Sequence, residues 1–427
     1  MRLPRNWGRA NKPVPDFSRT ITIIRFCLFA ICVFRPVMAY EDTPEIYLAD
    51  ILPPELRQSI RHRVEEVEVR RGIFHFYLES DFGAYNIATM GLLRERIREI
   101  SILGNAISQL GSQEDSQVHA TRGQLEIRSD RAVDIISRPV SSASNLAGQL
   151  ADNLSETLMG PAGTVAKEFI YSGGESADPV AALHKRNIAG QWQLDVYSTN
   201  PKVQEFLGAM AKARSAGTIS AGTPALNRQP VKPLLVADTV LDTELSSLLK
   251  ANGPVALNEI NERVLTGLNI SPELRTAFLQ HPVFSPRHKF RISHYLNKLA
   301  GVANLSAFIA AASKISEEYE ALAYEHLVMM MAHYHLTNHR LRELSPDRSG
   351  GRPHMEAITE DNQLLYFLVQ DLIYWNENTA RRLEAIPVWA RQAGTDNWQL
   401  ITSGSVTEDA RSRLRELRFA LVQQYTY

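Results

Sequence analysis

The sequence predicts an α+β fold that is predominantly α-helical. An N-terminal β-hairpin is followed by a long amphipathic helix, a helical middle and a small C-terminal α/β unit. Three patterns favour this class: alternating or β-prone residues over 63–80, apolar residues at intervals of three and four from Met90 to Leu110, and alternating strand and helix signals near the C-terminus. With 427 residues, 44 % hydrophobic and 22 % charged, the composition is globular, which excludes wholesale disorder, collagen and a polytopic membrane protein.

The first 39 residues have the three parts of a secretory signal peptide. A basic start precedes an apolar run of 14 residues, Ile21 to Phe34, and Val37 and Ala39 suit the −3 and −1 positions before Tyr40. A membrane-spanning helix needs about 20 apolar residues, so an uncleaved anchor is the less favoured alternative. We therefore predict an exported protein, periplasmic or secreted after cleavage near Ala39.

Removal of this segment changes the chemistry that is left in the mature chain. Both cysteines, Cys27 and Cys32, lie inside it, which excludes thiol catalysis, cysteine zinc sites and disulfide exchange in the mature protein. The segment holds seven of the 46 basic and one of the 47 acidic residues, so 39 and 46 remain and the net charge falls from −1 to near −7. Phosphate binding needs a basic surface, and nucleic acid is therefore not expected as a partner.

The first part of the mature chain, residues 40–214, is expected to hold the hairpin and several helices. Arg71-Gly72 occupies the hairpin turn, and Ser80–Gly83 is expected to turn the chain from strand to helix. The charged residues Arg94–Glu99 fall on the faces of the long helix that its apolar stripe leaves free. Asp81 begins a tripeptide that also occurs in kinases, but the other kinase segments are absent, so a turn is the favoured interpretation.

Capping residues placed before prolines mark helix starts in the middle of the chain. Residues 215–345 are predicted to form a helical domain that opens with a linker over 215–233 and ends with a long helix from Ile315 to Leu344. Three cap-proline pairs occur in the chain: Asn200-Pro201, Ser271-Pro272 and Ser285-Pro286.

Residues 346–427 are predicted to form the small α/β unit. Trp398–Ile401 has the pattern of a strand, and Ser405 with Glu408 forms a capping box for a helix through Arg418. The other elements expected here are a helix over Leu364–Arg382, an extended segment over Ile386–Ala390 and a closing strand within Phe419–Tyr427.

Four short segments, Ser80–Gly83, Leu92–Ile100, Val196–Pro201 and Leu400–Ser405, are spread over most of the mature chain. In these segments the chain resembles an uncharacterised family of exported proteobacterial proteins. The resemblance implies an envelope protein and transfers no catalytic residue to any position of this sequence.

A histidine pair in the long helix is the candidate metal site. His335 and His339 lie four residues apart, a spacing that places both imidazoles on one helix face and that zinc proteases use. The residue after the first histidine is Leu336, so the general base of those proteases is missing. A third ligand would have to come from elsewhere, such as His354 or Glu356. An exposed, solvated pair is the favoured alternative.

Two further polar residues are candidates in the C-terminal unit. Asp371 lies among apolar residues and is expected to be partly buried, either in a salt bridge with an arginine or as a catalytic carboxyl group with a raised pKa. Ser405 follows a predicted strand and a glycine, where backbone N–H groups at a helix start bind anions in other proteins. Helix capping alone also explains Ser405, and it is the favoured interpretation.

The leading functional hypothesis is an exported cell-envelope protein that binds or scaffolds without catalysis. Its partner would be another envelope protein or a small ligand, and no cofactor is expected. The alternative is a metal-dependent hydrolase that uses His335 and His339 with a divalent metal. A third class is peripheral contact with a membrane through the leucine stripe over 146–158, although packing in the core is favoured because no lysine or arginine flanks the stripe.

Overall fold

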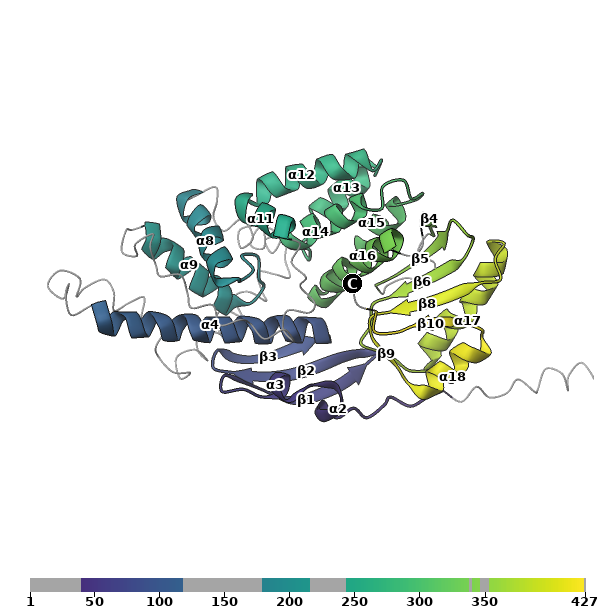
Figure 1. Cartoon of the computed structure of the whole chain (residues 1–427), viewed down its shortest axis with the longest axis horizontal. Coiled ribbons are helices and arrows are strands. Elements are labelled where there is room, and N and C mark those ends of the chain that lie inside the picture. The colour runs from purple at the N-terminus through teal and green to yellow at the C-terminus, as the bar shows by residue number, and fades with distance from the viewer. Residues whose placement is uncertain (1–39, 118–178, 216–242, 338–339, 346–352, 426–427) are drawn as a thin grey trace, which may run out of the picture. The chain divides into compact units, whose positions relative to one another are not determined.

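The computed structural model describes residues 40–117, 179–215, 243–337, 340–345 and 353–425 (Figure 1). Residues Asp42–Tyr427 group into one compact unit. Helices and strands both occur there, as the sequence predicts, and helices predominate. Among the helices within these ranges, none combines the length and the apolar character needed to cross a bilayer.

The predicted hairpin is confirmed and gains a third strand. Strands β1 (His62–Arg70), β2 (Ile73–Ser80) and β3 (Gly83–Ala88) form an antiparallel sheet in that order, and Arg71 and Gly72 make the first turn with positive φ angles. The expectation of a strand-to-helix turn at Ser80–Gly83 is wrong. The Ser80 hydroxyl donates to the Gly83 carbonyl at 2.8 Å, and the tight turn returns the chain as β3.

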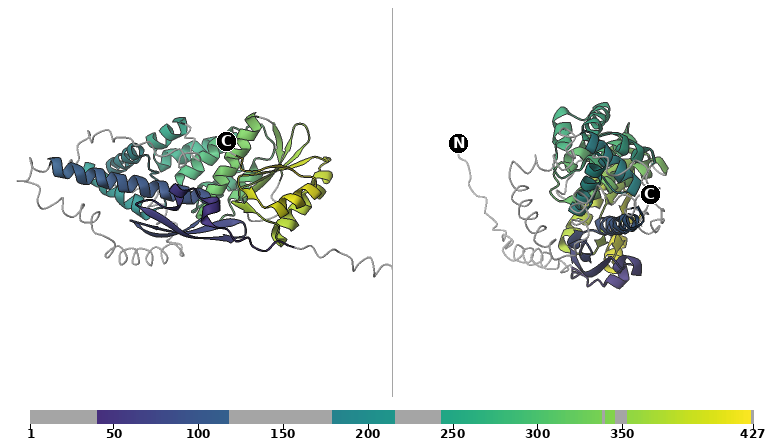
Figure 2. Two further views of the ribbon diagram at one scale, coloured as in Figure 1. Left: turned by 60° about the horizontal axis from the view of Figure 1, so that its bottom comes forward. Right: turned by 90° about the vertical axis from the view of Figure 1, so that its left-hand side faces the viewer.

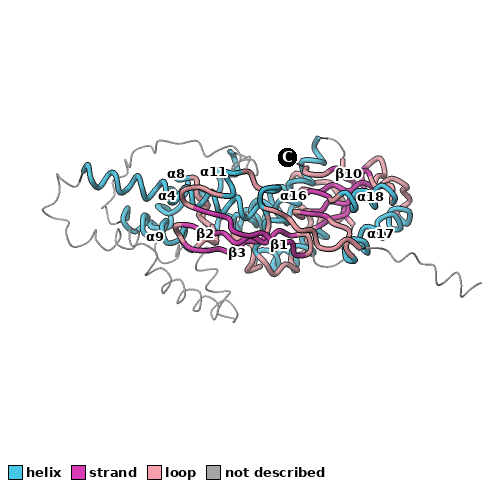
Figure 3. Tube along the Cα trace, turned by 90° about the horizontal axis from the view of Figure 1, so that it is seen from below, coloured by secondary structure: helices cyan, strands magenta, loops and turns pink. Residues whose placement is uncertain are grey.

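Helix α4 (Met90–Gln117) covers one face of this sheet. Phe74, Phe76 and Leu78 alternate along β2 and are buried against Leu93 and Ile97 of the helix, as strand and helix periodicities require. The short helix α3 (Pro54–Arg57) contributes the buried Leu56 to the same cluster, and Leu52, directly after the short helix α2 (Leu48–Ile51), is buried there as well. Figure 3 shows the three strands in front of the helices when the molecule is seen from below.

The helical middle begins its helices where the cap-proline pairs predict. Helices α9 (Pro201–Ser215), α13 (Pro272–Leu279) and α14 (Pro286–Asn297) start at the three prolines, and the Ser271 and Ser285 hydroxyls accept N–H groups of the first turn. The predicted helix over 146–158 and nearly all of the predicted linker lie outside the described residues. The other helices of this part are α8 (Pro179–Trp192), α11 (Thr243–Ala251), α12 (Pro254–Gly267), α15 (Ser306–Ala312) and α16 (Glu318–Thr337).

The predicted long helix from Ile315 to Leu344 is too long at both ends. Helix α16 stops at Thr337, and the chain then forms strand β4 (Leu341–Leu344). The backbone N–H of Leu344 donates to the Ala303 carbonyl at 3.0 Å, and both ends of β4 are buried. As a strand, residues 341–344 gain burial and hydrogen bonds, and these outweigh the hydrogen bonds that a longer helix would add.

The C-terminal sheet has five strands in the order β10-β8-β6-β5-β4. Its parallel half is β6 (Leu364–Leu368), β8 (Trp398–Thr402) and β10 (Ala420–Val422), while β5 (His354–Thr359) pairs antiparallel with both β6 and β4. Helices α17 (Glu377–Gln392) and α18 (Glu408–Glu416) connect the parallel strands and cover one face, and the helical middle covers the other (Figure 1). The strand at 398–401 and a closing strand are thus confirmed.

Three local predictions in this unit are wrong. Residues Leu364–Leu368 are a strand and not part of a helix, because both faces of β6 are buried and the run lacks the alternation that identifies a half-exposed strand. The segment expected to be extended over Ile386–Ala390 lies inside α17, which tolerates Pro387. The cap of α18 is Thr407, whose hydroxyl accepts the Ala410 N–H, and not Ser405.

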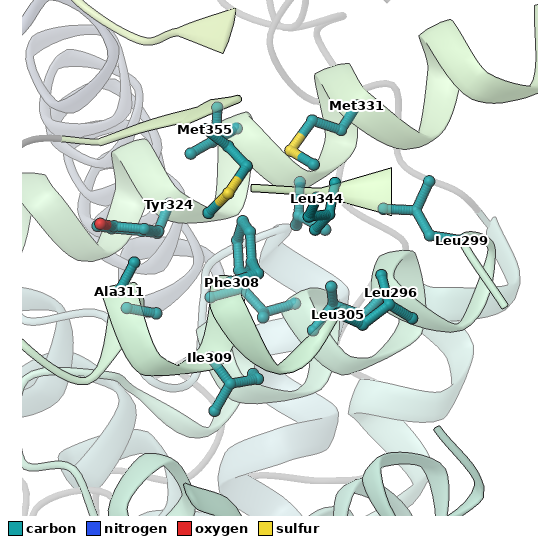
Figure 4. Packing of buried hydrophobic residues seen from close by; sticks show 14 of the residues in the cluster. Leu296, Leu299, Leu305, Phe308, Ile309, Ala311, Tyr324, Met331, Leu344 and Met355 are labelled. Atoms are coloured by element: carbon teal, nitrogen blue, oxygen red, sulfur yellow. The ribbon is translucent and has the colours of Figure 1, made fainter. Parts of the chain in front are cut away.

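The largest apolar cluster joins the helical middle to the five-stranded sheet. Figure 4 shows Phe308, Tyr324 and Met331 of the helices gathered around Leu344 and Met355 of the sheet. A second cluster fills the space between the sheet and α17 and α18, and others lie under α4. Figure 2 shows α4 lying along the three-stranded sheet. Buried charged groups lie between these clusters, where several elements meet.

Candidate functional site

The most polar buried region lies where α4, the segment 195–200, α14 and α16 meet. Two of its carboxylates, those of Glu99 and Glu325, belong to residues that are only 2 % exposed. We call this region the Arg287 cluster. Its members are Glu95, Arg96, Glu99, Asp195, Ser198, Asn200, Arg287, His288, Arg291 and Glu325.

Arg287 is the centre of the cluster. Its Nη1 atom lies 2.6 Å from Glu95 and 2.8 Å from Asp195, and its Nε atom lies 4.0 Å from Glu325. Arg291, one turn further along α14, contacts Glu325 at 2.8 Å. The N-terminal half of α14 thus supplies the positive charge that three carboxylates from other elements need in order to be buried.

A second pair extends the cluster toward the surface. Arg96 donates to Glu99 at 2.6 Å within α4, and its Nη2 atom lies 3.6 Å from Glu318 at the start of α16. Glu99 also accepts hydrogen bonds from the Asn200 amide, at 3.1 Å, and from the Ser198 hydroxyl. The partners come from α4, from the segment 195–200 and from α16, so these contacts connect that segment and the two helices.

Burial and charge act in opposite directions on the acidic groups. Burial alone raises the pKa of Glu95, but the charge and hydrogen bonds of Arg287 outweigh it and hold the pKa at about 2. Burial prevails over Arg96 at Glu99 and raises its pKa. Burial, aided by Arg287, lowers the pKa of His288 to about 4, so this imidazole is neutral at neutral pH.

The cluster encloses only a small cavity. Its volume is about 10 Å³, which is room for about one water molecule. Thr199 is exposed and Glu318 is 38 % exposed at its rim, whereas Arg287 and His288 lie further in. The arrangement can hold a water molecule and connects four chain segments.

Sequence reasoning missed this site. The periodicity of α4 places Arg96 and Glu99 off its apolar stripe, yet both are buried, at 6 % and 2 % exposure. The segment 195–200, which is about a hundred residues away in the sequence, covers this face of α4. The available signal was the resemblance, since two of its segments, Leu92–Ile100 and Val196–Pro201, meet here.

Asp371 forms a second polar site, which is partly buried and lies just after the end of β6. Its carboxylate accepts the backbone N–H groups of Phe74, at 2.9 Å, and of Met90, at 3.0 Å. Burial raises its pKa to about 6, although these two hydrogen bonds act to lower it. Asp371 therefore joins the C-terminal sheet to the first turn of α4 and to β2.

The structure brings Ser405 to Asp371 through backbone groups. The Ser405 N–H donates to the Asp371 carbonyl at 3.0 Å, and the N–H groups of Ser403 and Gly404 donate to Leu368 and to the Thr402 hydroxyl. All three N–H groups of the proposed anion site are thus engaged within the chain. Strands β7 (Leu372–Ile373) and β9 (Ser405–Val406) pair directly after this contact.

The remaining candidates lie apart from one another in the fold. Asp81 is half exposed in the turn between β2 and β3 and pairs with Arg61 at 3.5 Å. His335 accepts the Leu341 N–H at Nδ1, which leaves Nε2 as the nitrogen that a metal could use, and His339 lies outside the described residues. Within the described ranges, no group of three or more histidine, cysteine or acidic side chains is arranged to hold a metal ion. His354 and Glu356, considered as third ligands, are buried in β5.

Comparison with protein-family models, with curated proteins and with solved structures finds no match to this chain. The kinship with exported proteobacterial proteins therefore stays a prediction from the four segments named above.

Proposed function

We propose that this chain is an exported cell-envelope protein that acts by binding or scaffolding and not by catalysis. The observation that carries the proposal is the state of the Arg287 cluster. Its charged groups are paired with one another around a cavity with room for about one water molecule.

The hydrogen bonds of the cluster favour a structural role over a chemical one. A catalytic arginine or imidazole needs a free side that faces substrate. Arg287 is instead surrounded by carboxylates, and the Nδ1 atom of His288 accepts the Ser285 N–H. Loss of one partner from a buried ion pair costs about 3–5 kcal/mol, so the cluster can hold four segments in a fixed arrangement.

The sequence supports the proposed export of the protein and the proposed kind of binding partner. The predicted signal peptide, the thiol-free mature chain and its net charge near −7 are all consistent with export. The resemblance to exported proteobacterial proteins points the same way. The partner would be another envelope protein or a small ligand, and contact with a membrane would be peripheral.

Two measurements on native material test the proposal. N-terminal sequencing of protein from the envelope or the medium should give a chain that begins at Tyr40, and an intact Met1 on cytosolic protein would contradict export. The purified mature chain should not turn over ester, phosphate or peptide substrates repeatedly. Turnover that disappears in His288→Gln, while Asp81→Asn retains it, would overturn the non-catalytic assignment.

Metal analysis of the same preparation addresses the hydrolase alternative. Stoichiometric zinc that is lost in His339→Ala, together with hydrolytic activity, would replace the binding proposal by the metal-dependent hydrolase. Protein that retains its fold and binds no zinc under the same conditions would support the binding proposal.

A further inference from the structure

A serine and a histidine are paired in the tight turn that precedes β1. The Ser59 Oγ atom lies 2.8 Å from Nδ1 of His62, and Nε2 of the same ring lies 3.2 Å from the Leu56 carbonyl oxygen. His62 is 5 % exposed, whereas Ser59 is exposed. The backbone N–H of Ser59 donates to the His62 carbonyl at 2.8 Å and holds the turn closed.

The contacts of the ring fix its tautomer. A carbonyl oxygen only accepts hydrogen bonds, so Nε2 must carry the proton that is donated to Leu56. In the neutral ring Nδ1 is then unprotonated and accepts the hydroxyl proton of Ser59. Burial lowers the pKa of His62, which keeps the ring neutral at neutral pH. This is the arrangement of a hydroxyl nucleophile, a base and a group that orients the base.

Four other histidines of the described chain differ from His62 at Nδ1. Nδ1 of His281, His288 and His335 accepts a backbone N–H, so that nitrogen is not available to a hydroxyl group. For His333 the partner is the phenol hydroxyl of Tyr425, at 2.7 Å, and not a serine. At Ser59, in addition, the Arg61 N–H donates to Oγ at 3.1 Å, which favours negative charge on that oxygen.

The residue after the serine offers a donor for a developing oxyanion. Ile60 is 92 % exposed, and its N–H has no acceptor within the part of the chain that the structure describes. In hydrolases the N–H of the residue that follows the nucleophile has this role. The side chain of Ile60, the next residue along the chain, is exposed apolar surface.

We propose that Ser59 is a covalent acylation site, with His62 as its general base and an activated ester of an apolar acid as the donor. The Ser59 Oγ atom bonds to the carbonyl carbon of the ester while its proton passes to Nδ1 of His62. The bond to the leaving alcohol then breaks, and the alcohol takes that proton. The product is one ester per chain, so the site adds a covalent attachment to a binding protein and needs no turnover.

Reaction of the mature chain with p-nitrophenyl butyrate and with an alkyl fluorophosphonate tests this site. Mass spectrometry should show one adduct per chain, on Ser59, and Ser59→Ala should abolish it. His62→Gln should slow formation of the adduct by about 100-fold or more, as expected on removal of a general base. Ser80 is the matched control, because it accepts the Phe82 N–H at 3.1 Å but donates to a carbonyl and not to an imidazole. Ser80→Ala should change nothing.

Three results would overturn the proposal: no adduct, equal labelling of Ser59 and Ser80, or an adduct on Ser59 that forms at the same rate in His62→Gln. Circular dichroism shows whether that variant is folded. If it is not, the pH profile of the unsubstituted chain decides. A labelling rate that levels off above pH 6.5 supports a histidine base, and a rate that keeps rising to pH 9 contradicts it. Failure here leaves the binding role untouched, because the adduct is counted per chain and not by turnover.

Discussion

Acidification should affect the partly buried Asp371 and the buried His288 in opposite directions. The pKa of Asp371 is raised from 3.8 to about 6, so its contribution to the free energy of unfolding is fully present below pH 3.8 and is lost as the pH rises through 6. The pKa of His288 is lowered from 6.5 to about 4, so its contribution is fully present above pH 6.5 and is lost as the pH falls through 4.

Both contributions are of the same size. At 1.36 kcal/mol for each pKa unit, the shift of Asp371 corresponds to about 3 kcal/mol and that of His288 to about 3 kcal/mol. Between pH 7 and pH 4 the two nearly cancel in the unsubstituted chain. Single substitutions should separate them.

Urea unfolding of the mature chain at pH 4, 5, 6 and 7 measures the effect. From pH 7 to pH 4, the free energy of unfolding of Asp371→Asn should fall by about 3 kcal/mol more than that of the unsubstituted chain. The reason is that the variant lacks the stabilisation that protonation of Asp371 provides. The free energy of unfolding of His288→Gln should fall by about 3 kcal/mol less than that of the unsubstituted chain, because the variant has no imidazole to protonate. The constant cost of a lost hydrogen bond, about 1–3 kcal/mol, shifts each curve without changing its slope.

The other titrating groups are common to all three chains and drop out of the differences between them. A stability difference between Asp371→Asn and the unsubstituted chain that stays constant within about 1 kcal/mol from pH 4 to pH 7 would refute the reasoning. It would mean that the two N–H groups on Asp371 offset its burial and that its pKa is not raised.

Two other substitutions test the packing around the two polar sites, and a third, at Gly208 on α9, is the control for the glycine substitution. Arg287→Met should lower the free energy of unfolding at pH 7 by about 3–5 kcal/mol, because it leaves buried carboxylates without their cation, and a loss below 1 kcal/mol in urea unfolding would contradict the role of the cluster. Gly404→Ala should cost about 3 kcal/mol or more, because its Cβ would lie 2.0 Å from the Gln370 carbonyl oxygen. Gly208→Ala, in an open position on α9, should instead stabilise the chain by up to about 1 kcal/mol, and thermal unfolding distinguishes the two glycines.

Local signals in the sequence predict local structure well. The cap-proline pairs at Ser271 and Ser285 identify helix starts because the capping hydrogen bonds join residues three positions apart. The first hairpin is predictable because its strands are also joined by contacts between residues that are close in the sequence. Strand β6 is not, since burial on both faces replaces alternation by a continuous apolar run that a buried helix also shows.

The candidate site depends on contacts that no local pattern encodes. Glu99 lies on a helix face that a single amphipathic pattern leaves outside the core, and its partners Ser198 and Asn200 are a hundred positions away. Asp371 is recognisable as a polar residue among apolar neighbours. Its partners, the N–H groups of Phe74 and Met90, carry no sequence signal, because every residue except proline has a backbone N–H.

The position of Asp371 also bears on function. In α/β folds, ligands bind beyond the carboxyl ends of the parallel strands. Here the residues that follow β6 and β8 pack on one another at Gly404, and the turn at Gly72 closes over Gln370 and Leu372, whose N–H donates to the Gly72 carbonyl at 3.0 Å. A ligand at this edge would have to displace the chain's own hairpin. At this edge of the sheet the chain's own segments are joined to one another, in the place where other α/β folds bind a ligand.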